Sequence, residues 1–259
     1  MARRLGGRFL LRIEDIDTAR TREAFVAAIY DDLAWLGLQW ETPVLRQSQH
    51  HADYHAAAAR LNAMGLLYPC FATRGEILAA AQPGVVDPDG APIYPGLGRR
   101  LDSSEVARRK RAGQPFAMRL DMERALHLLK RGGARDTLTF TELDANGRPE
   151  RVAADPARWG DVVIQRRDVP TSYHLSVVVD DARQGITHVT RGRDLLAATD
   201  VHRLLQALLD LPEPLYHHHR LVTDEQGRKL AKSASDVGLK ELRARGLTPD
   251  AIRRLVGLA

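Results

Sequence analysis

Three acids, Glu14, Asp15 and Asp17, end an apolar run near the start of the sequence. A surface loop carries such charges at little cost in free energy. At the end of a buried strand the same charges are costly unless they bind a partner or a ligand. Ligands of open parallel sheets lie outside the carboxyl ends of the strands. Glu14 is therefore the candidate ligand-binding acid, and Asp17 suits an N-cap equally well. A cation site is a weaker interpretation, because Arg12 and Arg20 stand close by.

Two lysines, Lys229 and Lys232, stand three residues apart in "RKLAKSAS", and serines 233 and 235 follow. Two ammonium groups in one loop can neutralise phosphates that gain charge during group transfer. The alternative is an ordinary solvated basic loop. The acids at the predicted strand end favour the phosphate site.

A run of histidines and a run of basic residues are more simply explained by a structural role than by a functional site. In the run His217–His219 only the first and third side chains share a face of a strand, and no cysteine or acid accompanies them at ligand spacing. We expect one histidine to be structural or to face a ligand rather than to bind a metal. The basic run Arg108–Arg111 is typical of a solvated helix end, with a nucleic-acid contact as the alternative.

The elements that must position these residues follow from apolar spacing. A strand is predicted at residues 9–14, a helix through residues 25–36 ending at Gly37, and a second helix over residues 51–64. Asp17 or Thr18 is the expected N-cap of the first helix. Strand, helix and helix in this order predict a parallel α/β sheet.

An inserted module is predicted from Tyr68 to Arg167, where the rhythm of the sequence changes. A loop rich in proline and glycine comes first, followed by a short basic helix (103–113), a strand near 116–122 and a hairpin turning at "ANGR". The sheet pattern then resumes with a strand at Leu175–Val179 that ends in paired acids. A helix over residues 194–211 follows, and a short helix closes the chain.

Composition limits the class of protein. The chain has 259 residues, 44% of them hydrophobic, and a net charge of +5, a mild lean towards polyanionic partners. No apolar run approaches the ~20 residues of a membrane helix, and the start lacks a secretory pattern. A single cysteine, Cys70, fits a reducing compartment. We expect a cytoplasmic protein.

Three stretches of the sequence resemble the catalytic half of glutamyl-tRNA synthetases, which are class I aminoacyl-tRNA ligases: "LLRIEDIDTAR", "GDVVIQRRDVPTSYHLSVVVDDARQGITHVTRGRDLLAATDVH" and "RKLAKS". The last stretch is similar to the KMSKS signature. The resemblance implies an α/β, Rossmann-like catalytic domain with an inserted α+β module. Its first half would span residues 1–67, the module 68–167, the second half 168–220, and the KMSKS-type loop with a C-terminal helix 221–259.

The chain stops soon after that signature, where a discriminating glutamyl-tRNA synthetase continues into an anticodon-binding region. This favours the short paralogue family, the glutamyl-Q tRNA(Asp) synthetases. That family activates glutamate with ATP, bound with Mg²⁺, and transfers it to queuosine in tRNA(Asp). A monomer without membrane contact is expected.

The resemblance also implies roles for individual residues. Glu14, Tyr173 and Arg191 match the glutamate-binding positions, and a planar guanidinium suits a carboxylate. Lys232 matches the ATP-contacting lysine, and Lys229 and Lys232 are the candidate catalytic residues.

Two departures from the family pattern bear on function. The family often holds zinc with three cysteines and a tyrosine, but here Cys70 and Tyr94 stand with Ala72 and Gly98, so no zinc is expected. The first strand and the HIGH-type helix start, which cradles ATP, are also expected to be absent. A catalytically silent tRNA- or glutamate-binding paralogue, or a fragment of a glutamyl-tRNA synthetase, are therefore the alternatives.

Overall fold

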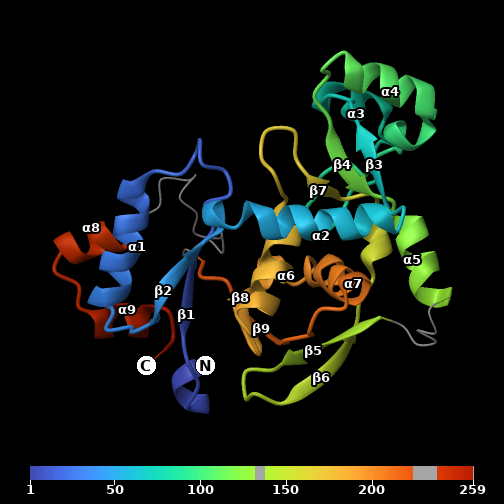
Figure 1. The fold of residues 1–259 in the computed structure, drawn as a ribbon. Helices are drawn as coiled ribbons and strands as arrows, with labels where there is room; N and C mark the ends of the chain where they lie inside the picture. Colours follow the sequence, from blue (N-terminus) through green and yellow to red (C-terminus); the bar gives the residue numbers. More distant parts are fainter. Residues whose placement is uncertain (132–137, 224–237, 259) are drawn as a thin grey trace. The chain divides into compact units, whose positions relative to one another are not determined.

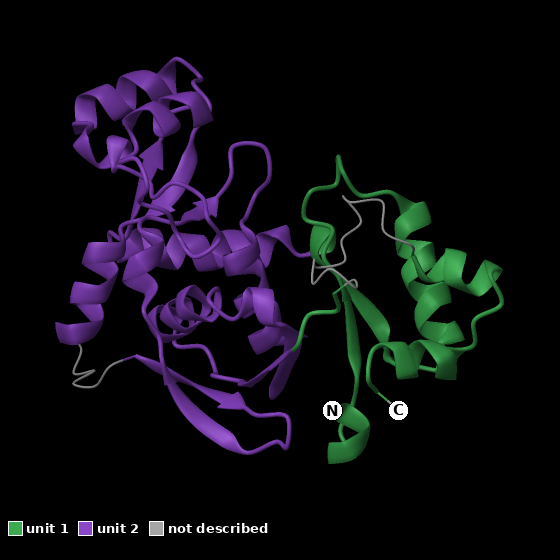
Figure 2. Cartoon of the chain, turned by 180° about the vertical axis from the view of Figure 1, so that it is seen from behind, with its two compact units in different colours: residues 1–49, 220–259 green, residues 50–219 purple. Residues whose placement is uncertain are grey.

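The computed structural model describes residues 1–131, 138–223 and 238–258. The chain divides into two compact units, each described here by itself (Figure 2). Unit 1 combines residues 1–49 with residues 220–259, and unit 2 is the continuous segment 50–219. This division by contacts does not test the predicted boundaries of the inserted module, which stay a prediction.

Unit 1 is built on two parallel strands joined by a helix. Its described elements are η1 (Ala2–Leu5), β1 (Leu10–Ile13), α1 (Glu23–Trp35), β2 (Glu41–Arg46), η2 (Gln47–Gln49), α8 (Leu239–Ala244) and α9 (Pro249–Leu255). Ile13 of β1 pairs with Arg46 of β2 in a parallel register. Gly37, with φ +70°, follows the last turn of α1 in a left-handed conformation that glycine adopts without strain. The predicted first strand and first helix are thus confirmed.

The predicted N-cap of that helix is wrong. Helix α1 begins at Glu23, and its N-cap residue Arg22 makes no side-chain capping bond. The carbonyl of Asp17 instead accepts hydrogen bonds from the backbone N–H groups of Arg20 and Thr21, which closes a separate turn before the helix. The segment after β1 is therefore a turn and not a helix start.

Unit 2 contains two sheets and six α-helices within its described residues. Its helices are α2 (His51–Ala63), α3 (Arg74–Ala80), α4 (Ser103–Arg111), α5 (Met122–Arg131), α6 (Tyr173–Arg183) and α7 (Thr199–Leu209). Its 3₁₀ segments are η3 (Leu97–Arg100), η4 (Pro156–Trp159) and η5 (Arg193–Leu195). Its strands are β3 (Leu67–Cys70), β4 (Ala117–Leu120), β5 (Thr139–Leu143), β6 (Pro149–Ala153), β7 (Val163–Gln165), β8 (His188–Gly192) and β9 (Leu215–His219).

The sheet that positions the candidate site has the strand order β6-β5-β9-β8 (Figure 1). Strands β5, β9 and β8 are parallel, whereas β5 and β6 form the antiparallel hairpin predicted from the Asn-Gly turn. The second sheet, β3-β4-β7, is antiparallel. The chain therefore has the mixed α/β fold with parallel strands that the sequence predicts.

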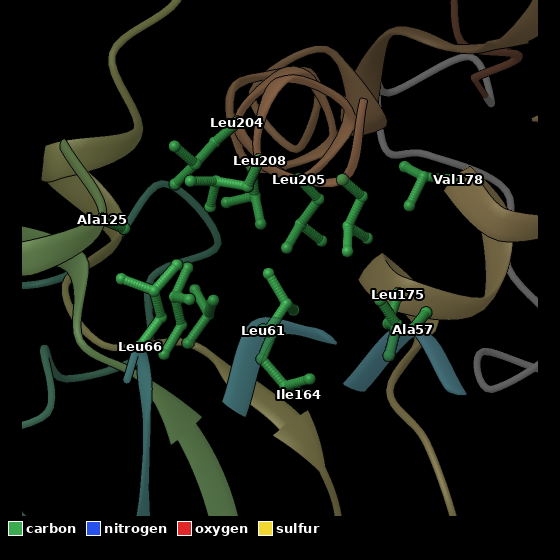
Figure 3. Packing of buried hydrophobic residues seen from close by; sticks show 14 of the residues in the cluster. Ala57, Leu61, Leu66, Ala125, Ile164, Leu175, Val178, Leu204, Leu205 and Leu208 are labelled. Atoms are coloured by element: carbon green, nitrogen blue, oxygen red, sulfur yellow. The ribbon is translucent and has the colours of Figure 1, made fainter. Parts of the chain in front are cut away.

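The core of unit 2 lies where α2, α6 and α7 pack on one another (Figure 3). Leu61, Leu175, Leu204 and Leu205 are each fully buried there. Burying one such side chain contributes about 1.5–3 kcal/mol. This packing holds α6 and α7 rigidly beside the parallel strands, and the candidate site uses the first turns of both helices.

The strand predicted at Leu175–Val179 is wrong, because these residues belong to helix α6. A short run with three successive valines suits a buried strand, but it also suits a helix that is covered on several sides. Helix α6 packs on both α2 and α7, and Leu175, Val177 and Val178 are buried. The Ser172 hydroxyl caps its start by accepting from the Leu175 N–H at 3.4 Å.

Candidate glutamate and nucleotide site

The predicted site residues of unit 2 meet at the carboxyl ends of parallel strands. Arg191 lies near the end of β8, directly opposite His218 near the end of β9. Glu142 lies near the end of β5, the next strand along. Helices α6 and α7 bring Tyr173 and His202 to the same place. This is the end of a parallel sheet at which ligands of α/β proteins bind.

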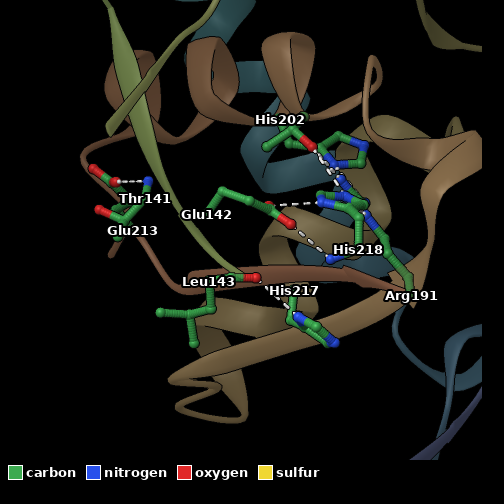
Figure 4. A network of polar contacts seen from close by, with 9 residues as sticks. Thr141, Glu142, Leu143, Arg191, His202, Glu213, His217 and His218 are labelled. Carbon is green, nitrogen blue, oxygen red and sulfur yellow. Dashed lines mark hydrogen bonds and ion pairs between the residues drawn. The ribbon is translucent and has the colours of Figure 1, made fainter. Parts of the chain in front are cut away.

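The Arg191 guanidinium is the centre of this cluster (Figure 4). Its Nε donates to Nε2 of His218 at 3.0 Å, and its Nη2 donates to Oγ1 of Thr199 at 2.7 Å. Its Nη1 lies 3.0 Å from Nδ1 of His202 and 3.5 Å from the hydroxyl of Tyr173. A guanidinium has five N–H donors, so these contacts fix its plane and leave an Nη2 donor for a ligand.

The histidines around Arg191 are held neutral. Burial lowers the pKa of His174 to about 4, and the Arg191 charge acts in the same direction. Burial, His174 and Arg191 also hold the pKa of His202 well below its usual value. His174 and His202 share a hydrogen bond of 3.2 Å. Because the pKa values of both rings are lowered by burial, Arg191 carries the positive charge of this group near pH 7.

Glu142 and Tyr216 complete the surroundings of Arg191. The carboxylate of Glu142 lies 2.8 Å from Nδ1 of His218, whose pKa is lowered by burial against the opposing effect of Glu142. The Arg191 guanidinium lies 5.3 Å from the centre of the Tyr216 ring, which stacks on His218. Burial raises the pKa of Tyr216 to about 12. The cluster thus holds a half-buried cation in direct contact with neutral side chains, while the Glu142 carboxylate is engaged by His218, and the cation suits a ligand carboxylate.

Glu14 lies in unit 1, one residue after β1, and 44% of its side chain is exposed. Its carboxylate lies 3.5 Å from the Arg12 guanidinium. The neighbouring Asp15 is the buried acid: it accepts from the N–H and hydroxyl of Ser48, both at 2.8 Å, and from Arg46. Burial raises the pKa of Asp15, but these partners together lower it. Asp15 is structural, whereas the exposed position of Glu14 suits a ligand.

A family model described as "tRNA synthetases class I (E and Q), catalytic domain" matches residues 1–259. The chain belongs to this family. It is 47% identical over 265 residues to the glutamyl-Q tRNA(Asp) synthetase of Rhodobacter capsulatus, covering 100% of this chain and 91% of the relative. The corresponding protein of Symbiobacterium thermophilum is 39% identical over 260 residues, which cover 97% of this chain and 76% of the relative.

Longer relatives match over the same region. Glutamate–tRNA ligase 2 of Nitrosococcus oceani is 36% identical over 267 residues, or 97% of this chain and 52% of that protein. The solved glutamate-tRNA synthetase of Elizabethkingia anophelis shares the fold, with a TM-score of 0.67 at 24% identity, covering 89% of this chain and 47% of that one. A Mycobacterium tuberculosis methionyl-tRNA synthetase gives a TM-score of 0.51 at 14% identity, covering 97% of this chain and 57% of that one. The fold is that of class I synthetases.

The residues at the zinc positions implied by the resemblance make other contacts. The Tyr94 hydroxyl accepts from the Gly98 N–H at 2.6 Å, and Cys70 is buried beside it. A Cβ added at Gly98 would lie 2.5 Å from the backbone oxygen of Pro69. The loop therefore has no room for a cysteine at this position, and the residues present do not fit a tetrahedral zinc site.

Several predictions from the sequence concern other residues. Lys229 and Lys232 lie outside the described residues. In the run His217–His219 the side chains alternate as expected of a strand, and Nδ1 of His217 lies 2.9 Å from the Leu143 carbonyl. Across the described segments no group of three histidine, cysteine or acidic side chains is placed to hold a metal ion. No helix among those described is long and apolar enough to cross a membrane.

Five residues of the cluster were not singled out from the sequence: Glu142, His174, Thr199, His202 and Tyr216. Thr199 and His202 contact Arg191 from 8 and 11 residues further along the chain, whereas Glu142 contacts His218 across 76 residues. Thr199 and His202 stand one turn apart on α7, but the same spacing is usual for a buried helix face. Only the strand order, which brings β5 beside β9, places Glu142 here. Nothing in the sequence pattern signals that pairing.

Proposed function

We propose that this chain activates glutamate with ATP and transfers the glutamyl group to the queuosine base of tRNA(Asp). The observation that carries this proposal is the Arg191 cluster at the carboxyl ends of β8 and β9. It lies in a chain that matches relatives named for this reaction along its full length. The proposal places the protein in the cytoplasm, acting as a monomer with ATP bound as its Mg²⁺ complex.

The chemistry has two steps. In the first, an oxygen of the glutamate α-carboxylate attacks the α-phosphorus of ATP, and the bond from that phosphorus to pyrophosphate breaks. In the second, a hydroxyl of the queuosine cyclopentenediol attacks the acyl carbon of glutamyl-adenylate. That hydroxyl loses its proton, and AMP leaves. Both steps depend on positioning of reactants and on stabilisation of charge.

The residues of the chain divide these tasks in our proposal. Arg191 binds a glutamate carboxylate with its remaining Nη2 donor, and Tyr173 contacts the same ligand. Glu14 binds the α-ammonium group, which its exposed carboxylate suits. Lys229 and Lys232 neutralise the phosphates during transfer, with Lys232 in contact with ATP.

Substitution of Arg191 tests the first step. Arg191→Ala should weaken glutamate binding by about 2 kcal/mol or more, roughly thirtyfold, because a charged hydrogen-bonding group is lost. Arg191→Lys should restore only part of the affinity, since one ammonium group cannot keep the contacts to His218, Thr199 and His202 that direct the remaining Nη2 donor. Glutamate-dependent ATP–pyrophosphate exchange measures this, with the exposed Arg148→Ala as the matched control. Unchanged exchange in Arg191→Ala would refute the assignment.

The acceptor is tested separately with radiolabelled glutamate and tRNA(Asp). Label should appear on tRNA that contains queuosine, and should persist when the 3′-terminal adenosine has been removed. Transfer that needs the 3′ adenosine would identify an ordinary glutamyl-tRNA synthetase activity. Glutamate binding without exchange or transfer would identify the catalytically silent alternative.

A further inference from the structure

We propose that Glu142 and His218 are positioning residues, which act together to orient the Arg191 guanidinium for its carboxylate ligand. The identity of that ligand as glutamate rests on the proposed function. Neither residue needs to touch the ligand in this proposal. Their role is to fix which atoms of Arg191 point towards it.

Glu142 holds His218 at two points. Its Oε1 accepts from the backbone N–H of His218 at 2.8 Å, and its Oε2 lies 2.8 Å from Nδ1 of the same residue. The side chain of His218 is 2% exposed, and that of Glu142 is 19% exposed. Figure 4 shows the Glu142 carboxylate between β5 and β9, directed at His218. The imidazole therefore cannot turn without breaking a bond to a carboxylate shielded from water.

The contact with Glu142 determines which nitrogen of the His218 imidazole donates a hydrogen bond and which accepts one. A carboxylate accepts only, so Nδ1 of His218 carries the proton that it donates to Glu142. In the neutral ring Nε2 is then an acceptor, and it accepts from Nε of Arg191 at 3.0 Å. Without Glu142 the proton is free to move to Nε2, where it would oppose the Arg191 N–H. The Glu142 carboxylate thus affects Arg191 indirectly, by selecting the His218 tautomer that accepts from its Nε–H.

The other contacts of Arg191 show what this orientation achieves. Nε is held by His218, Nη2 by Thr199, and Nη1 by His202. A guanidinium fixed at three nitrogens loses little freedom when a carboxylate binds its remaining donor, so affinity rises by preorganisation. Loss of the His218 contact releases the Nε end and leaves the side chain free to rotate.

A merely structural role for Glu142, as a tie between the hairpin and the rest of unit 2, is served by other residues. Glu213 accepts from the backbone N–H of Thr141 at 3.1 Å and from Arg151 at 3.0 Å. It also forms an ion pair of 3.1 Å with Arg203. The hairpin therefore has its own attachment beside Glu142.

The test compares Glu142→Ala, Glu142→Gln and Glu150→Ala in the full chain, with glutamate affinity measured by calorimetry. Glu142→Ala should weaken glutamate binding about tenfold or more, the size of loss seen when the hydrogen-bonding partner of a metal-ligating histidine is removed. Glu142→Gln keeps one acceptor oxygen and should lose less. Glu150, which lies opposite Glu142 on β6 and is exposed, is the matched control and should bind as the parent does.

A second readout separates positioning from stability and from the identity of the ligand. The ¹⁵N shifts of His218 should show a proton on Nδ1 in the parent and a mixed tautomer in Glu142→Ala. The Nε–H of Arg191 should exchange faster with water in that variant. Parent-like tautomer and exchange in Glu142→Ala would overturn the proposal, as would parent-like affinity where Arg191→Ala has lost binding. If Arg191→Ala binds glutamate normally, the proposed function fails, and the two spectroscopic readouts still decide the positioning role.

Discussion

Mild acid should destabilise unit 2 through its buried histidines. His174 contacts His202 at 3.2 Å and packs its ring edge-on against Trp159, with ring centres 5.7 Å apart. Burial, with the Arg191 charge, lowers its pKa to about 4 from an ordinary value of 6.5. Between those two values the unfolded chain binds a proton that the folded chain does not. Stability is therefore retained above pH 6.5 and lost as the pH falls towards 4.

The size of the loss follows from the two pKa values. For His174 alone, linkage gives about 2 kcal/mol less stability at pH 5 than at pH 7. His202 acts in the same direction, because burial also lowers its pKa. Asp15, whose pKa is lowered, contributes only below its unfolded value of 3.8, so it adds little above pH 5. A loss of this size is a large part of the ~5–15 kcal/mol that stabilises a domain.

Urea unfolding at pH 7 and pH 5 measures the effect. With a slope of about 2 kcal/mol per molar urea, the midpoint should fall by about 1 M between the two pH values. His174→Asn keeps an oxygen acceptor for His202 but cannot titrate, so its pH-dependent loss should be about 2 kcal/mol smaller. His127→Asn, an exposed site on α5, should behave as the parent does. Equal losses in the parent and in His174→Asn would refute this reasoning.

Three further outcomes are expected at pH 7. Leu205→Ala, in the fully buried core, should lower the free energy of unfolding by about 2–5 kcal/mol. The control Leu255→Ala, at a residue that is 67% exposed, should change it by less than about 0.5 kcal/mol. Equal urea midpoints for the two variants would contradict the packing described. Tyr54→Phe should cost about 1–3 kcal/mol, because its hydroxyl donates to the buried Asp180 carboxylate at 2.9 Å; an unchanged midpoint would show that other donors suffice. Gly98→Cys should lower the melting temperature, because the new Cβ would lie 2.5 Å from a backbone oxygen. Elemental analysis of this variant should find no stoichiometric zinc. One zinc per chain would show that the loop rearranges.

Local signals in the sequence were enough to predict the elements that end at characteristic turn residues. Gly37 ends α1 as predicted, and Asn146 with Gly147 turns the β5–β6 hairpin. The run Leu175–Val179 failed because periodicity does not separate a buried strand from a helix covered on several sides. Ser172, which caps α6, is the signal that would have identified the helix.

The candidate site divides in the same way. Arg191 and Tyr173 were identified because they stand in stretches that resemble the family, and the structure brings their side chains to 3.5 Å. Glu142 and His202 were not identified, since their roles depend on neighbours that are remote in sequence. The sequence does not reveal that two histidines will form a hydrogen bond in the fold, because a histidine can also be buried in a core without any ligand role.

The discontinuous make-up of unit 1 has a consequence for synthesis on the ribosome. Unit 2 is continuous, so all of its residues emerge before residues 220–259, which complete unit 1. At about 5–20 residues per second, the 170 residues of unit 2 separate the two parts of unit 1 by roughly 10–35 s. During that interval α1 lacks Arg243, which contacts Asp32 and the Trp35 ring in the finished unit. Unit 2 can therefore begin to fold before unit 1 is whole, and the nascent first 49 residues are open to chaperones until residues 220–259 have emerged.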